Sequence, residues 1–256
     1  MTTIPEFGDG ISIVIPAFNE AARIGATIAA IEDYAGARFQ AWEIVVVDDG
    51  SSDDTAAAAR GAIKDPSKLV VVTNPGNRGK GFSTKNGCAH ARFPYVLMSD
   101  ADLSTPIEEI EKLAARAAPD AVVIASRALQ GSNLEVRQPI YREMMGRIFN
   151  LLVQLLVIRG IHDTQCGFKL FGSEIVKHVM PALETNGFAF DVELLARADR
   201  MGYRIFEVPV TWRNDERTRV SALSDSARMF RDMVAVRFKV NKIPKAGQRR
   251  SDGRVQ

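Results

Sequence analysis

Short apolar runs alternate with longer amphipathic stretches along the first half of the chain. Five runs of four or five residues are almost continuously hydrophobic, at residues 11–15, 44–47, 69–72, 95–98 and 121–124. Strands of a parallel sheet that is covered on both faces show this pattern. Stretches of helical length and composition separate them, at about residues 20–33, 53–63, 79–92 and 106–117. The alternation predicts an α/β fold, in which right-handed crossovers build a doubly wound, mostly parallel sheet flanked by helices.

The alternation ends after residue 127. We expect a mobile loop to begin at Gly131 and a long helical stretch to follow at residues 139–159. Within it, residues 148–158 are densely apolar, but this segment is too short and too interrupted to span a bilayer. It is either a buried core helix or an interfacial helix. The arginines beside it are Arg142, Arg147 and Arg159.

The C-terminal part of the chain is basic. From residue 200 onward it carries 14 Lys or Arg against 6 Asp or Glu, although the net charge of the whole chain is only +2. Residues 223–239 predict an amphipathic helix, and the polar residues 246–256 are expected to form a disordered tail. A basic end favours an anionic partner, either a membrane surface or a phosphorylated substrate. No aromatic-rich RNA motif or zinc-finger spacing accompanies it, so we expect no nucleic-acid partner.

Composition sets the class of protein. With 256 residues, of which 46% are hydrophobic and 25% charged, the chain can bury one substantial core. We expect a single domain over residues 1–245, with a disordered tail after it. Cys88 and Cys166 have neither a disulfide-framework nor a zinc spacing, which fits a reduced, cytoplasmic setting. No signal peptide or transmembrane start is visible at the N-terminus.

Polar residues follow the predicted strands at one edge of the sheet. Residues 16–20, 48–49, 74–80 and 100–102 all come directly after an apolar run. Ligands of doubly wound sheets bind beyond the carboxyl ends of the strands. Polar residues also follow buried strands for structural reasons alone, but three acidic sites on one rim would repel each other without a cation or a cationic partner. This convergence favours a functional site.

The pair Asp100 and Asp102 is the strongest chemical feature of that rim. Two carboxylates with one small residue between them can hold a divalent cation against a diphosphate. The structural alternative is that Asp102 begins a turn or caps a helix that starts near Pro106. After the first strand there is no GxGxxG motif, and the chain has no Walker A lysine motif, which argues against dinucleotide oxidoreductases and P-loop NTPases.

Four motifs together resemble the inverting glycosyltransferases of family 2. They are the segments 13–20 (IVIPAFNE), 46–55 (VVDDGSSDDT), 77–81 (NRGKG) and 100–102 (DAD). Three further segments, 163–171 (DTQCGFKLF), 190–194 (FDVEL) and 208–212 (VPVTW), are similar to the dolichyl-phosphate β-glucosyltransferase branch. The resemblance covers about residues 11–220 and implies a GT-A fold with a mixed, mostly parallel sheet. It implies a nucleotide-binding half at about 10–127 and an acceptor half at about 128–245.

The resemblance also implies a site for a nucleotide sugar. Asp100 and Asp102 would hold Mg²⁺ or Mn²⁺, which neutralises the departing diphosphate. Related phospholipid mannosyltransferases have a glutamine two residues past the second aspartate, whereas this chain has Ser104 there. The residues that the resemblance places around the donor nucleotide are Pro16, Phe18, Glu20, Val47, Asp49, Lys80, Asp100, Ala101 and Arg219.

For the acceptor, the resemblance implies a polyprenyl or dolichyl phosphate. Such a phosphate is already anionic near pH 7, so the enzyme needs cations more than a strong base. Arg127 and Arg142 match positions that hold phosphate, and Asp163 matches a carboxylate near the anomeric carbon. Asp191 matches either the general base of relatives that glycosylate hydroxyl groups or a helix cap.

These expectations define a metal-dependent transferase that moves glucose from UDP-glucose to a polyprenyl phosphate with inversion. The alternatives are a GDP-mannose polyprenyl-phosphate mannosyltransferase, a family 2 transferase acting on a sugar hydroxyl, and a non-catalytic nucleotide-sugar sensor. The expected location is cytoplasmic, peripheral at the cytoplasmic face of a membrane. The sequence leaves the oligomeric state open.

Overall fold

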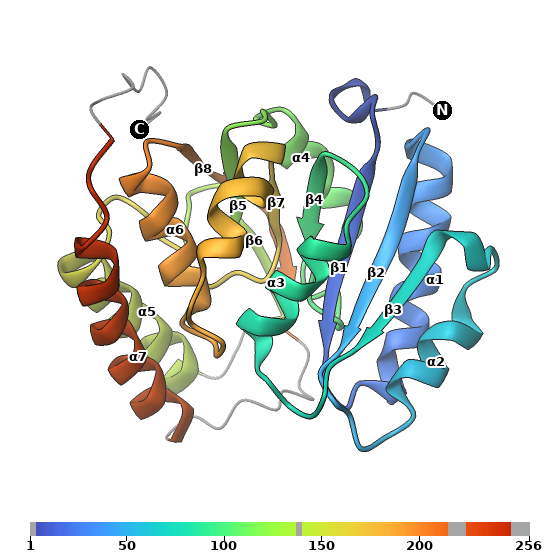
Figure 1. The fold of residues 1–256 in the computed structure, drawn as a ribbon, viewed down its shortest axis with the longest axis horizontal. Coiled ribbons are helices and arrows are strands. Elements are labelled where there is room, and N and C mark those ends of the chain that lie inside the picture. The colour runs from blue at the N-terminus through green and yellow to red at the C-terminus, as the bar shows by residue number, and fades with distance from the viewer. Residues whose placement is uncertain (1–3, 137–139, 215–223, 247–256) are drawn as a thin grey trace.

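A central sheet of seven strands runs through the molecule, with helices on both faces (Figure 1). The computed structural model describes residues 4–136, 140–214 and 224–246. The strand order is β3-β2-β1-β4-β7-β5-β8. The strands of this sheet are β1 (Ile11–Ala17), β2 (Trp42–Asp48), β3 (Leu69–Thr73), β4 (Tyr95–Met98), β5 (Ala121–Ser126), β7 (Lys169–Phe171) and β8 (Arg204–Pro209).

All neighbouring strands of the sheet are parallel except at β7, which is antiparallel to both β4 and β5. The five strands predicted from the sequence are confirmed, and so is the mixed, mostly parallel sheet. A separate pair, β6 (Asn133–Val136) and β9 (Thr211–Arg213), forms a small parallel sheet. The expectation of a mobile loop from Gly131 is therefore wrong for β6, whose backbone pairs with β9.

Helices follow the predicted pattern with one exception. They are α1 (Ala21–Arg38), α2 (Thr55–Ala62), α3 (Lys80–His90), α4 (Ile110–Ala114), α5 (Ile140–Leu156), α6 (Phe190–Arg200) and α7 (Ser224–Asn241). Short 3-10 helices lie at Pro5–Phe7, Pro66–Lys68, Ile107–Glu109 and Met180–Ala182, and a π-helical turn lies at Ile175–Val179. The exception is the helix expected at about residues 106–117, which is a 3-10 turn followed by the short α4.

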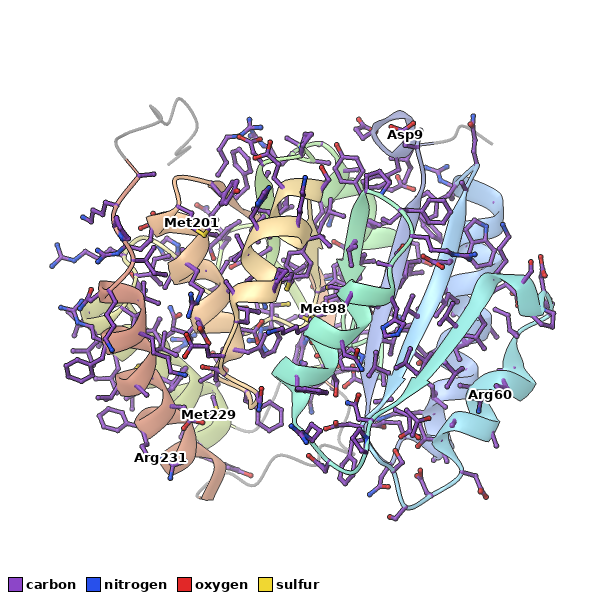
Figure 2. All side chains as sticks on the ribbon, viewed as in Figure 1. Asp9, Arg60, Met98, Met201, Met229 and Arg231 are labelled. Carbon is purple, nitrogen blue, oxygen red and sulfur yellow. The ribbon has the colours of Figure 1, made fainter. Side chains whose placement is uncertain are left out.

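Each strand contributes to two hydrophobic cores, because successive side chains point to opposite faces. Ile13 and Ile15 pack on one face with α1, α2 and α4. Val14 and Met98 pack on the other face with α3, α5, α6 and α7, and Met98 lies near the centre of the molecule in Figure 2. Burial on both faces explains why the predicted strands are apolar throughout.

The order of the strands reverses at β1. This strand pairs with β2 on one side and with β4 on the other. The connection from β1 to β2 runs through α1 on one face, whereas the connection from β3 to β4 crosses the sheet through α3 on the other face. Such a switch point opens a crevice at the carboxyl ends of the strands. The residues predicted to bind a ligand lie at this edge.

Candidate active site

Asp49 organises the loop that leads into α3. Its side chain is buried, and its two oxygens accept hydrogen bonds from the side chain of Asn74 and from the backbone N–H groups of Arg78 and Gly79. The donor–acceptor distances are 2.8, 2.9 and 2.7 Å. Asp49 thereby fixes the position at which Lys80 begins the helix.

Lys80 and Asp100 form an ion pair between the start of α3 and the end of β4. The Nζ of Lys80 lies 2.5 Å from Oδ1 of Asp100. Burial alone would lower the pKa of Lys80, but the neighbouring carboxylates raise it above its ordinary value, Asp100 most strongly and then Asp191. Lys80 is therefore a permanent cation at neutral pH, next to a carboxylate predicted to bind a metal.

Asp102 lies two residues further along the same loop. Its Oδ1 accepts a hydrogen bond of 2.9 Å from the backbone N–H of Ser104, as the turn interpretation predicts. Its Oδ2 lies 4.0 Å from Nη1 of Arg23. Burial raises the pKa of Asp102, and the negative charge of Asp100 raises it further. The two carboxylates repel each other, and a divalent cation would relieve that repulsion.

This pair of carboxylates fits a hard cation that also binds phosphate. Mg²⁺ is usually held by one or two carboxylates together with phosphate oxygens and waters. Within residues 4–136, 140–214 and 224–246, no three His, Cys, Asp or Glu side chains gather as a metal site. A cation at Asp100 and Asp102 would therefore take the rest of its ligands from a bound diphosphate and from water.

Gly167 brings a second loop directly against Asp100. A Cβ atom at residue 167 would lie 1.8 Å from Oδ2 of Asp100, so a glycine is needed for this close approach. Gly167 and Asp100 line one small cleft together with Ser104 and Trp212. The loop of residues 161–167 is therefore one wall of the acidic site.

Arg127 and Asp163 form a bidentate ion pair at the other end of this loop. Nε and Nη2 of Arg127 donate to the two carboxylate oxygens at 2.7 and 2.8 Å, and the backbone N–H of Arg127 donates at 2.9 Å. Burial alone would raise the pKa of Asp163, but the guanidinium holds it below its ordinary value. Both oxygens of Asp163 are engaged, so this residue anchors Arg127 rather than acting as a free base.

Two residues that the sequence did not single out support this pair. Glu207 on β8 accepts the backbone N–H groups of His162 and Asp163 at 2.8 and 2.9 Å. The guanidinium carbon of Arg127 lies 5.4 Å from the ring centre of Trp212, within the range of a cation–π contact. The motif at residues 208–212 does not by itself predict that Trp212 positions Arg127.

The role of Lys169 was not predicted from the sequence. It is fully buried, and its Nζ donates to Oδ1 of Asp191 at 2.6 Å and to the carbonyl of Cys166 at 2.5 Å. Burial raises the pKa of Asp191, while the charges of Lys169 and Lys80 act against that rise. A lysine inside the apolar run 168–171 was the available signal, because a buried lysine requires a partner.

The other predicted donor residues lie along the same edge in different settings. Phe18 is partly exposed, whereas Val47 is fully buried in the core beneath the edge. Glu20 pairs with Arg23, and the carbonyl of Ala101 accepts the hydroxyl of Thr27 at 2.6 Å. Pro16 lies near the end of β1. Arg219 lies outside the described residues, as do residues 247–256 of the predicted tail, and of Arg142 only the backbone, in α5, is described.

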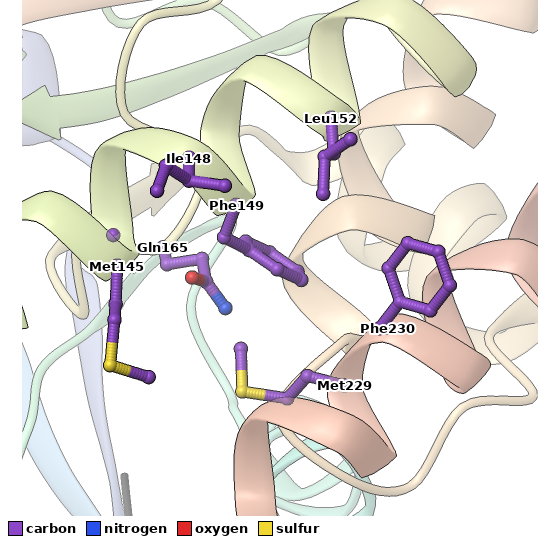
Figure 3. A pocket seen from close by; sticks show the side chains of 8 residues that line it. Met145, Ile148, Phe149, Leu152, Gln165, Met229 and Phe230 are labelled. Carbon is purple, nitrogen blue, oxygen red and sulfur yellow. The ribbon is translucent and has the colours of Figure 1, made fainter. Parts of the chain in front are cut away.

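An apolar pocket of about 250 Å³ lies between α5 and α7 (Figure 3). Phe149 from α5 and Met229 from α7 point into it, and Gln165 of the loop 161–167 lies at its edge. On α5, Asn150 donates to the carbonyl of His162 at 2.7 Å, which ties the helix to the same loop. The pocket and the acidic site therefore share the loop 161–167 as a common wall.

The surface around this pocket is unusually apolar. The segment 148–158 is only partly buried. Val153 lies in the core, whereas the neighbouring turns of α5 expose large apolar side chains. No helix in the described part of the chain is long and apolar enough to cross a bilayer. The exposed apolar residues of α5 and α7 are Tyr141, Met144, Ile148, Leu151, Leu155, Phe230 and Phe238.

Comparison with known proteins identifies the family. The model described as Glycosyl transferase family 2 matches residues 12–180, which is more than half of the chain. The chain belongs to glycosyltransferase family 2. The transferase is 34% identical over 250 residues to the dolichyl-phosphate beta-glucosyltransferase of Saccharomyces cerevisiae, covering 89% of this chain and 74% of that protein. The enzyme of that name from Homo sapiens is 31% identical over 255 residues, covering 93% and 79%.

Solved structures show the same fold. The glucosyl-3-phosphoglycerate synthase of Mycobacterium tuberculosis, in complex with Mn²⁺, UDP-glucose and phosphoglyceric acid, aligns with a TM-score of 0.70 at 22% identity. The alignment covers 94% of this chain and 82% of that one. The complex of that synthase with UDP aligns with a TM-score of 0.67. The predictions of a GT-A fold and of a family 2 hexosyltransferase are confirmed.

Proposed function

We propose that this transferase moves glucose from UDP-glucose to a polyprenyl phosphate such as dolichyl phosphate, with a divalent cation and with inversion at C1. The observation that carries the proposal is the loop 161–167. One end of this loop contacts Asp100 through Gly167, its start holds Arg127 through Asp163, and Gln165 reaches the apolar pocket. The carboxylate proposed to bind the cation, an arginine and an apolar pocket thus lie around one loop.

The donor half of the site suits a sugar diphosphate. A bound Mg²⁺ or Mn²⁺ would supply Lewis-acid neutralisation of the departing diphosphate. Asp100 and Asp102 would hold that ion, and Lys80, which pairs with Asp100, would donate to a diphosphate oxygen. The names of the relatives support glucose as the transferred sugar, and the UDP-glucose complex of the Mycobacterium tuberculosis synthase supports UDP as the nucleotide.

The acceptor half suits a phosphate monoester, which is already anionic near pH 7 and attacks C1 without a strong base. Arg127 is 30% exposed at its side chain and uses two guanidinium nitrogens for Asp163. A guanidinium has five N–H groups in a planar fork, so further N–H groups remain to orient the acceptor phosphate. In-line attack opposite the leaving UDP inverts the anomeric centre in one displacement.

The lipid chain of the acceptor would leave the site along the pocket between α5 and α7. Its volume of about 250 Å³ is below the roughly 300–1,000 Å³ of sites that enclose a drug-sized ligand. It therefore takes only a segment of a long chain, and the rest would continue over the exposed apolar residues of α5 and α7 into a membrane. A peripheral position on a membrane follows from this proposal, and the two free cysteines favour its cytoplasmic face.

Nucleotide release tests the proposal. UDP-glucose and GDP-mannose are each incubated with Mn²⁺, with and without a short polyprenyl phosphate. We expect acceptor-dependent release of UDP, reduced about 100-fold or more in Asp100→Asn because the leaving diphosphate loses its cation. The control is Asp33→Asn, which removes an exposed carboxylate on α1 that pairs with Lys64. Release from GDP-mannose alone, or release that ignores the acceptor, would contradict the proposal.

A further inference from the structure

The ammonium group of Lys80 lies where a metal ion would compete with it for the carboxylate of Asp100. Its Nζ lies 2.5 Å from Oδ1 of Asp100, so the ammonium group already engages a carboxylate oxygen that a metal ion would use. The side chain of Lys80 is only 19% exposed, so this ion pair is enclosed rather than screened by bulk water. A divalent ion ligated by Asp100 would lie within a few ångströms of the ammonium group. Like charges at that separation repel strongly in a partly buried site.

The surroundings let Lys80 release Asp100 without moving its backbone. Asp49 holds the backbone N–H groups of Arg78 and Gly79 and so fixes the residue at the start of α3. The long side chain above it remains free to change partners. Asp191 already contributes to the charge environment of Lys80, but it is shared with Lys169 at 2.6 Å.

The start of α3 also favours an anion at this point. The first backbone N–H groups of a helix and its dipole attract negative charge, and a lysine in the first turn is unfavourable there unless an anion offsets it. Asp100 offsets the charge of this lysine. A diphosphate bound beside α3 would offer the ammonium group a second anion of higher charge.

From these contacts we infer that Lys80 is a resident counter-ion, which competes with the divalent metal for Asp100 until the donor diphosphate draws the lysine away. The inference rests on the proposed function, because it presumes a metal and a diphosphate at this site. Its consequence is that metal and nucleotide bind as a coupled pair, each raising the affinity of the protein for the other by the same factor. The enzyme then seldom holds a metal without its donor.

Mn²⁺ binding measured by electron paramagnetic resonance of the free ion tests this without turnover. Wild type, Lys80→Met, Lys80→Arg and Lys64→Met are titrated with and without UDP. We expect Lys80→Met to bind Mn²⁺ about tenfold more tightly than wild type when UDP is absent, and to gain less from UDP. Lys80→Arg keeps the charge, and Lys64→Met removes an exposed lysine that pairs with Asp33, so both should behave like wild type.

An unchanged Mn²⁺ affinity of Lys80→Met without UDP would overturn the inference and leave the proposed transfer reaction intact. A wild-type protein that binds no Mn²⁺ even with UDP would overturn both. If Lys80→Met does not fold, acetylation of the wild-type protein decides, with Lys64 as the internal reference in peptide mass spectrometry. We expect high Mn²⁺ to increase acetylation of Lys80 several-fold, and no increase would overturn the inference.

Discussion

At the scale of single residues, Arg127 and Asp163 depend on each other. Asp163→Asn keeps the shape of the side chain but leaves the guanidinium without its carboxylate. We expect a loss of about 3 kcal/mol in the free energy of unfolding at pH 7, the lower end for a broken buried pair, because Arg127 is partly exposed. Chemical denaturation of wild type and variant measures this loss.

The pH dependence of that difference follows from the pKa of Asp163. Arg127 holds this pKa below its ordinary value in the folded state. The pair therefore stabilises the fold above the unfolded pKa of about 4, and the stabilisation is lost as the pH falls through the folded-state pKa. The gap between wild type and Asp163→Asn should narrow below about pH 4. A gap that stays constant in acid would contradict this account.

Lys169 presents the opposite case. It is a buried cation, and its removal leaves the buried carboxylate of Asp191 without this partner. Lys169→Met should cost about 3–5 kcal/mol at pH 7, because Asp191 is left charged and buried. Burial already raises the pKa of Asp191, and removing Lys169 raises it further. Because the pKa of Asp191 is higher in the folded state than in the unfolded state, its contribution to the stability of the fold is present at low pH and is lost as the pH rises. The cost should therefore shrink toward pH 5, and Lys169→Met/Asp191→Asn should be more stable than Lys169→Met at pH 7.

Gly167 tests whether the second loop must touch Asp100. Gly167→Ala places a methyl group on the Asp100 carboxylate, which has to rotate away from the position a metal needs. We expect transfer to fall at least about tenfold with a small change in melting temperature. Gly36→Ala is the matched control, since nothing lies within 4 Å of a Cβ there. Full activity of Gly167→Ala would show that the contact is dispensable.

The sequence predicted the residues of the site better than their partners. Asp49, Asp100 and Asp102 follow the ends of strands, and Lys80 begins the helix after β3, at positions where the alternating pattern places polar residues. The buried position of Lys169 has a signal in the sequence, but its partner could not be identified, because Asp191 lies 22 positions away. Contacts of that kind depend on the packing of strands that the apolar pattern does not register.

At the scale of elements, the strands of the acceptor half were missed for physical reasons. β7 has three residues, and one of them is Lys169. β8 includes two charged residues, Arg204 and Glu207, and none of its residues is buried. β6 and β9 are short and pair only with each other. A pattern of continuous apolar runs detects strands buried on both faces, and none of these strands has that pattern.

The helix α5 is expected to contact a membrane through its exposed apolar side chains. Leu155 is 64% exposed, so Leu155→Glu removes apolar surface without disturbing the core. Transfer of one leucine is worth about 1.5–3 kcal/mol, and a tenfold or greater loss of vesicle binding should follow. Co-sedimentation with vesicles containing anionic lipid measures it. Ala57→Glu, an exposed position on α2, is the control and should bind like wild type; equal binding of both variants would exclude α5 from the contact.

At the scale of the whole molecule, we propose that a donor half and an acceptor half meet at the loop 161–167. The donor half contributes Asp100, Asp102 and Lys80 from the ends of β4 and the start of α3. The acceptor half contributes Arg127 with its anchor Asp163 and the pocket between α5 and α7. The central claim is that glucose crosses from one half to the other, onto a lipid phosphate.

Transfer of radiolabelled glucose from UDP-glucose into an organic-phase polyprenyl phosphate tests that claim most directly. With Mn²⁺ and a short polyprenyl phosphate, we expect label in a lipid product that releases glucose on mild acid treatment and shows a β linkage by NMR. Label in the organic phase should disappear without the acceptor and in Asp100→Asn. Label that enters only a water-soluble product, or a lipid product with an α linkage, would contradict the account.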